Sequence, residues 1–147
     1  MTTRWLLAAF HLLALAIGPA SVFVRGRALR GPLDHDGLRR VFLADALWGV
    51  AALLWLATGL SRLFVEKGVA YYMQHPLFLT KMTLFLVIVA LEIWPMVTLI
   101  RWRIATRKGE LPDTNPARAM GAISYVQVAL VAVMVFLATA VARGLWA

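Results

Sequence analysis

Four long apolar stretches make up most of this chain and restrict what it can fold into. They cover residues 4–24, 42–64, 77–100 and 121–142, and each is close to the ~20 residues that an α-helix needs to cross a bilayer. Because the bilayer core offers no water to backbone groups, such stretches span it as helices with internal hydrogen bonds. Short connections make sequential helices antiparallel neighbours. The sequence therefore predicts an all-α integral membrane four-helix bundle with up-down topology, in one domain of residues 1–147.

The composition agrees with this prediction and excludes several classes of protein. Of the 147 residues, 62% are hydrophobic, which is well above the roughly half found in soluble domains. The net charge of +8 does not indicate nucleic-acid binding, because the Lys and Arg residues cluster between the spans. The absence of cysteine excludes disulfides, thiolate metal sites and thiol catalysis.

The basic residues predict the orientation of the bundle. Two loops are rich in them, and these residues are Arg25, Arg27, Arg30, Arg39 and Arg40 before the second span, and Arg101, Arg103, Arg107, Lys108 and Arg118 before the fourth. The loop after the second span contains a single Lys or Arg residue, Lys67. By the positive-inside rule both basic loops are cytoplasmic, so the two termini face outward. The first stretch is expected to be a retained span, since cleavage as a signal peptide would place the following arginines outside.

Polar side chains inside the membrane are expected in two layers, and the outer layer contains His11, Arg62 and Lys81. Counting ~1.5 Å per residue from the span ends places all three in the outward half. His11 has two interpretations: a packing histidine bonded to a neighbouring span, or a metal ligand, since imidazole binds haem iron and helix bundles hold porphyrins. Lys81 either extends to the outer interface, or faces inward as the cation for a carboxylate or propionate, or as an unusual ligand.

The inner layer contains Asp45 and Glu92, together with Gln127 and Tyr125 of the fourth span. Glu92 lies too far from either end of its span to reach water, so its carboxyl group is neutral or paired. It is a candidate proton carrier or, alternatively, a protonated glutamate bonded to Gln127 or Tyr125. Lys81 shares its helix face, because eleven residues at ~100° each bring the two within about 20°. Asp45 is expected to form an interfacial ion pair with Arg39 or Arg40.

Conventional catalytic signatures are missing from the sequence. It contains no Walker loop, GxSxG, HExxH or glycine-rich nucleotide fingerprint, so nucleotide-driven or hydrolytic chemistry is not expected. The three histidines are scattered over different segments and do not predict a zinc triad.

Two resemblances add to this reading of the residues. The whole chain resembles a family of small bacterial four-span membrane proteins classed as a domain of unknown function, through RWLLAAFHLLALAIG, LRRVFLADALWGVAALLWLATGL and HPLFLTKM with LEIWPMVTLIRWR. More distantly, the layout is similar to the membrane-embedded bacterial protoporphyrinogen oxidase, a four- or five-span family associated with haem b. His11, Gly18 and Arg25 resemble its first-span motif, and residues 81–91 resemble its third span. Where that family has a further histidine in this span, the chain has Glu92.

The second resemblance implies tetrapyrrole binding. The matched depth of His11 and Lys81 motivates haem b as the cofactor, with His11 as ligand to the metal and Lys81 or Arg62 near the propionates. The first hypothesis is therefore a redox-related membrane protein that binds b-type haem or porphyrin. The alternatives are a non-enzymatic accessory subunit of a larger membrane complex and a proton-coupled transporter that uses Glu92. We expect a multi-pass protein of the bacterial inner (plasma) membrane, whose partners are the lipid bilayer and either another membrane protein or a second copy of itself.

Overall fold

The computed structural model describes residues 2–65, 68, 70, 73–74 and 76–145, and Lys67 lies outside them. The long helices are α1 (Thr2–Leu29), α2 (His35–Val65), α4 (Pro76–Arg107) and α5 (Ala117–Ala142). No strand occurs in the described part of the chain. All four of these helices are long and apolar enough to cross a membrane, which confirms the predicted all-α membrane bundle.

The helices extend past the predicted spans at the end where the basic residues gather. α1 continues through Arg25 to Leu29, and α4 continues through Arg103 to Arg107. The sequence analysis assigned these arginines to loops, and the structure corrects that assignment. Hydropathy falls at the first charged residue, whereas the backbone hydrogen bonds of a helix continue regardless of side-chain charge. Two arginines are consequently positioned by helices and not by flexible connections.

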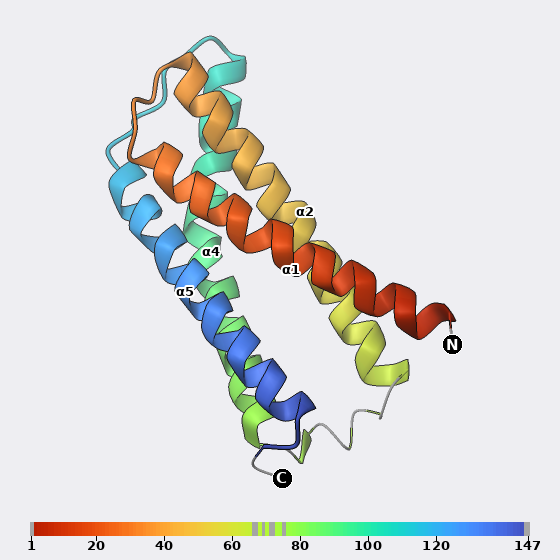
Figure 1. Cartoon of the computed structure of the whole chain (residues 1–147). Coiled ribbons are helices and arrows are strands. Elements are labelled where there is room, and N and C mark those ends of the chain that lie inside the picture. The colour runs from red at the N-terminus through yellow and green to blue at the C-terminus, as the bar shows by residue number, and fades with distance from the viewer. Residues whose placement is uncertain (1, 66–67, 69, 71–72, 75, 146–147) are drawn as a thin grey trace.

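The bundle consists of two helix pairs that meet at one end and diverge at the other. α1 packs against α2 and α5, and α4 packs against α5. Figure 1 shows that the α1 and α2 pair separates from the α4 and α5 pair toward the end where both termini lie. An up-down bundle with four spans requires both termini to lie at the same end. We call this the open end, and the opposite end, beside the basic loops, the closed end.

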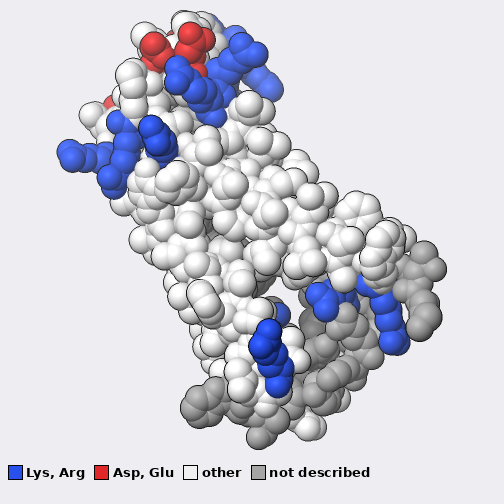
Figure 2. Space-filling view, in the orientation of Figure 1, with Lys and Arg blue, Asp and Glu red and all other residues white. Residues whose placement is uncertain are grey.

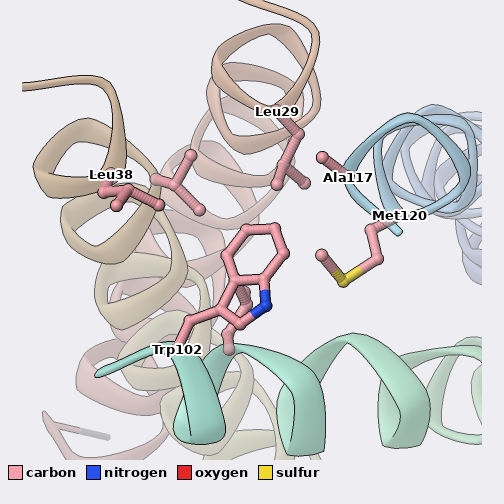
Figure 3. Close-up of a cluster of buried hydrophobic side chains, with 7 residues drawn as sticks. Leu29, Leu38, Trp102, Ala117 and Met120 are labelled. Carbon is pink, nitrogen blue, oxygen red and sulfur yellow. The ribbon is translucent and has the colours of Figure 1, made fainter. Parts of the chain in front are cut away.

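Large side chains from all four helices fill the closed end. This inner cluster comprises Leu29, Leu38, Val41, Leu99, Trp102, Ala117 and Met120, all of them buried. Figure 3 shows the Trp102 indole of α4 extending between Leu29 and Leu38 on one side and Met120 on the other. Because the inner cluster draws its residues from all four long helices, it holds both helix pairs together at this end.

Glycines allow α1 to approach its neighbours closely. A Cβ atom added at Gly26 would meet Ser124 Cβ at 3.0 Å and the Gly121 carbonyl oxygen at 3.2 Å. A Cβ atom added at Gly49 of α2 would have no such neighbour within 4 Å. Close backbone approach matters in lipid, where dispersion contacts and interhelical hydrogen bonds drive helix association.

We expect Gly26→Ala to destabilise the bundle by about 1–2 kcal/mol relative to Gly49→Ala, because only the first methyl group enters an occupied space. Both substitutions gain the same intrinsic helix propensity, so their difference reports the packing clash. Thermal or SDS-induced unfolding in detergent micelles measures it. Equal stability of the two variants would contradict the close approach of α1 and α5.

Candidate functional site

One arginine, Arg25 of α1, is fully buried in the middle of the bundle, with a relative exposure of 0%. It lies between the inner cluster and a second apolar cluster that comprises Val22, Trp48, Ile88, Val131 and Met134. An arginine remains charged in proteins, so its burial among apolar residues requires counter-charges and hydrogen-bond acceptors.

The Arg25 guanidinium binds carboxylates of two other helices. Its Nη1 and Nη2 atoms donate to Glu92 Oε1 and Oε2 of α4 at 2.6 and 2.9 Å. Nη1 also donates to Asp45 Oδ1 of α2 at 2.8 Å. The two parallel bonds to Glu92 are the fork geometry in which arginine binds carboxylates most strongly. Glu92 is therefore a paired carboxylate, one of the two states that its depth in the span allowed.

α5 supplies the remaining acceptors for Arg25. Nη2 donates to Gln127 Oε1 at 2.9 Å, and Nε donates to Ser124 Oγ at 3.1 Å. The Gln127 amide nitrogen then donates to Glu92 Oε2 at 2.8 Å, so Gln127 contacts both members of the central ion pair. Gln127 is thus the neighbour of Glu92 that the sequence analysis named as one of two alternatives.

Tyr125, the other alternative, lies elsewhere in the structure. Its ring meets Phe23 edge-on at 5.5 Å, and the Arg30 guanidinium lies over its face at 5.0 Å. Positions 125 and 127 are about 200° apart around a helix, so the two side chains face different neighbours.

Asp45 bridges two arginines, and neither is the expected one. Besides Arg25, it accepts a bond from Arg103 Nη2 of α4 at 2.7 Å, and the same nitrogen donates to a backbone carbonyl of α2 at 3.0 Å. The prediction of a pair with Arg39 or Arg40 is wrong, and both residues are exposed. Five or six residues before Asp45 at ~100° each place them about 120–140° away around the helix.

These contacts form one closed set of side chains, the Arg25 network, which comprises Arg25, Asp45, Glu92, Arg103, Ser124 and Gln127. Two arginines and two carboxylates give it no net charge. Within the described part of the chain, no buried side-chain nitrogen or oxygen lacks a hydrogen-bond partner. The network therefore meets the condition under which a charged cluster is tolerated inside a membrane protein.

Arg25 is the member that the sequence analysis assigned to a loop and not to the inner layer. A signal for it exists, because buried residues recur along α1 at helical spacing as Ala14, Gly18, Val22, Arg25 and Leu29. Extending this stripe past the last apolar residue of the span would place Arg25 on the packed face.

His11, in the outer layer, uses both ring nitrogens. The Trp55 indole Nε1 donates to His11 Nε2 at 2.9 Å, and His11 Nδ1 lies 2.9 Å from Thr58 Oγ1. An indole nitrogen only donates, so Nε2 accepts, and the proton of a neutral imidazole is on Nδ1. The Thr58 hydroxyl in turn donates to the Leu54 carbonyl oxygen at 2.7 Å. These are contacts of a packing histidine, while metal ligation by His11 stays a prediction.

Lys81 lies half-buried at the open end of α4. Its Nζ atom is 5.3 Å from the centroid of the Phe78 ring, and among the described residues it forms no salt bridge. Trp55, which donates to His11, also packs edge-on against Phe85, with the two ring centroids 6.1 Å apart. Phe85 lies one helical turn from Lys81 on α4, so this hydrogen bond and ring contact together link the helix of His11 to the helix of Lys81.

Arg25→Leu is expected to destabilise the protein by about 3–5 kcal/mol, because it leaves Glu92 without its cation and Asp45 with Arg103 alone. Arg27→Leu is the matched control, since Arg27 is exposed two residues further along the same helix. SDS titration in mixed micelles measures the difference. Adding Glu92→Gln to Arg25→Leu is expected to recover part of the loss, which a role in packing alone would not produce.

Comparison with known proteins identifies a family for this chain. The model of the family described as "Predicted membrane protein (DUF2214)" matches residues 3–145. No curated protein and no solved structure matches the chain, and the resemblance to protoporphyrinogen oxidase receives no support from these comparisons. Because the match extends over nearly the whole chain and includes all four long helices, the chain belongs to the DUF2214 family of predicted membrane proteins.

Proposed function

We propose that this membrane protein binds haem b or a related porphyrin in the open half of the bundle. His11 would be the ligand to the metal, and Lys81 or Arg62 would lie near the propionates. The observation that carries this proposal is the half-buried Lys81 inside a span, which forms no salt bridge among the described residues. Cations inside a span are costly without an anion, and propionates supply two carboxylates.

The protonation state of His11 supports the proposal. Its Nδ1 proton is fixed by Thr58, which leaves the lone pair of Nε2 as the atom available to a metal. Metal-binding histidines commonly fix the other ring nitrogen through such a second hydrogen bond. Trp55 occupies Nε2 in this structure, so haem binding requires the indole to move away.

Binding also requires the helix pairs to move apart. The apolar crevice beside Trp55, which α1 and α2 line together with Val131 of α5, has no space that a water molecule could enter, whereas a cofactor pocket encloses ~300–1,000 Å³. Figure 2 shows the surface hollowed between the two helix pairs toward the open end, with Lys and Arg side chains near it. Widening this gap would leave the Arg25 network intact, because the network lies nearer the closed end. Bound haem would supply one-electron chemistry, and the chain would hold and orient it.

We expect protein purified after haem-replete expression to show a Soret absorption band, and His11→Ala to remove it. Trp55→Phe is the matched control: it breaks the same hydrogen bond but leaves Nε2 available, so the band should persist or strengthen. Lys81→Gln should weaken haem binding by about tenfold, the effect of losing ~1.4 kcal/mol. Absence of the band in the unaltered protein, or a band unchanged by His11→Ala, would contradict the proposal.

Proton-coupled transport through Glu92 is the second candidate, and one observation favours it. The Glu92 side chain is 20% exposed and that of Asp45 is 13%, whereas Arg25, which pairs with both, is fully enclosed. The carboxylates thus lie at the outer edge of the network, and they are the members that a proton would reach before Arg25.

In proteoliposomes under an imposed pH gradient, Glu92→Gln is expected to abolish proton flux if this second function operates, because the amide does not ionise. Glu110→Gln, in the exposed loop after α4, is the control that should leave the flux unchanged. Flux that is equal in all three proteins, or not above that of empty liposomes, would exclude proton coupling through Glu92.

The cellular location and the protein partners are also part of this proposal. Four spans with the basic residues gathered at one end fit the bacterial inner (plasma) membrane. A role as a non-enzymatic accessory subunit, or as a homo-oligomer, stays a prediction, since exposed apolar faces suit lipid and a protein partner equally.

A further inference from the structure

A second polar feature lies at the closed end, separate from both layers. A cleft of about 430 Å³ opens where α1 ends and α5 begins. Its lining residues are Leu29, Arg30, Thr114, Asn115, Ala117 and Arg118. Figure 2 shows Lys and Arg side chains gathered around this end of the molecule. Because the cleft is at the junction of two spans with their loops, it lies at the depth of lipid headgroups.

Two guanidinium groups line this cleft, and one of them is held in place. The Arg30 guanidinium lies over the Tyr125 ring at 5.0 Å. Its Cγ atom is 3.3 Å from where a Cβ atom at Gly121 would be, so the absence of that Cβ gives its stem room against α5. Neither Arg30 nor Arg118 forms a salt bridge within the described residues. The two guanidinium groups therefore give the lining of the cleft a positive charge without a salt bridge of its own.

The lining combines these charges with an apolar floor. Leu29 and Ala117 are buried there at the ends of α1 and α5. Guanidinium groups bind phosphate oxygens in a two-point geometry, and the side chains of Thr114 and Asn115 add polar groups. A cleft of about 430 Å³ is much larger than a phosphate ion needs. Its size and its apolar floor fit a phosphate that carries a glycerol backbone.

From this geometry we infer that the cleft binds the headgroup of an anionic phospholipid, with the phosphate between Arg30 and Arg118 and the glycerol over Leu29 and Ala117. Basic pockets between helices at the cytoplasmic surface bind anionic headgroups in this manner. The bound lipid would connect the end of α1 to the start of α5 across the junction of the two helix pairs. The inference does not depend on the proposed function, because it uses none of the residues proposed to bind haem and none of the Arg25 network.

The test is native mass spectrometry of the full chain titrated with phosphatidylglycerol or phosphatidylcholine in detergent. We expect phosphatidylglycerol to remain bound at activation energies that strip phosphatidylcholine. Arg30→Gln with Arg118→Gln should weaken this binding by tenfold or more, since each lost charge-assisted contact accounts for about fivefold or more. Tyr125→Leu should weaken it by less, because it loosens Arg30 without removing a charge.

Arg39→Gln with Arg40→Gln is the matched control, which removes two exposed charges from the same side of the membrane but none from the cleft. Retained binding in this control supports a built site. Equal loss in both double variants would overturn the inference in favour of general charge attraction. Competition by millimolar inorganic phosphate would overturn it in favour of a soluble phosphate ligand. Circular dichroism and gel filtration check that the exposed substitutions leave the fold unchanged.

Discussion

The buried ion pair between Arg25 and Glu92 is the interaction on which the arrangement of the bundle depends. Lipid tails are as apolar as leucine side chains, so apolar packing alone selects weakly among helix rotations in a membrane. The network removes this freedom, because Arg25 is satisfied only when α2, α4 and α5 each present one particular face. Buried ion pairs are weak sources of net stability, and fixing a register is their best-attested use. Here the network specifies which faces meet, while the inner cluster supplies the apolar contact around it.

The two halves of the bundle differ in how their charges are balanced, and this difference directs the functional interpretation. At the closed half, two arginines and two carboxylates compensate each other within the protein. At the open half, His11 joins α1 to α2 through Trp55 and Thr58, but Lys81 finds only an aromatic face among the described residues. A closed half whose charges are paired, together with a divergent half in which Lys81 has no salt bridge among the described residues, favours binding of an anionic ligand at the divergent end. α1 connects the two halves, since His11 and Arg25 are about 21 Å apart along one helix.

Membership of the DUF2214 family establishes what kind of protein this is and leaves its chemistry to the two layers. The layers favour different functions for a physical reason. A proton carrier needs a carboxyl group that can lose its cation, and Glu92 is held by two hydrogen bonds from Arg25. A ligand site needs groups that can exchange their present contacts for a ligand, and the aromatic contact of Lys81 and the single hydrogen bond from Trp55 to His11 Nε2 fit this better. The open half is for this reason the stronger candidate.

The sequence by itself determined the helices, the membrane environment and the polar character of the inner layer, because span length, hydropathy and depth are properties of position along the chain. It also determined that Glu92 must be paired or neutral, and it placed Gln127 within reach. Only the tertiary structure decided that the partner is Arg25 and that Asp45 binds Arg103 instead of Arg39 or Arg40. The span predicted from hydropathy ended at residue 24, one residue before Arg25, the central residue of the network. The choice of partner depends on how each helix is rotated against its neighbours, and close packing of four helices sets that rotation.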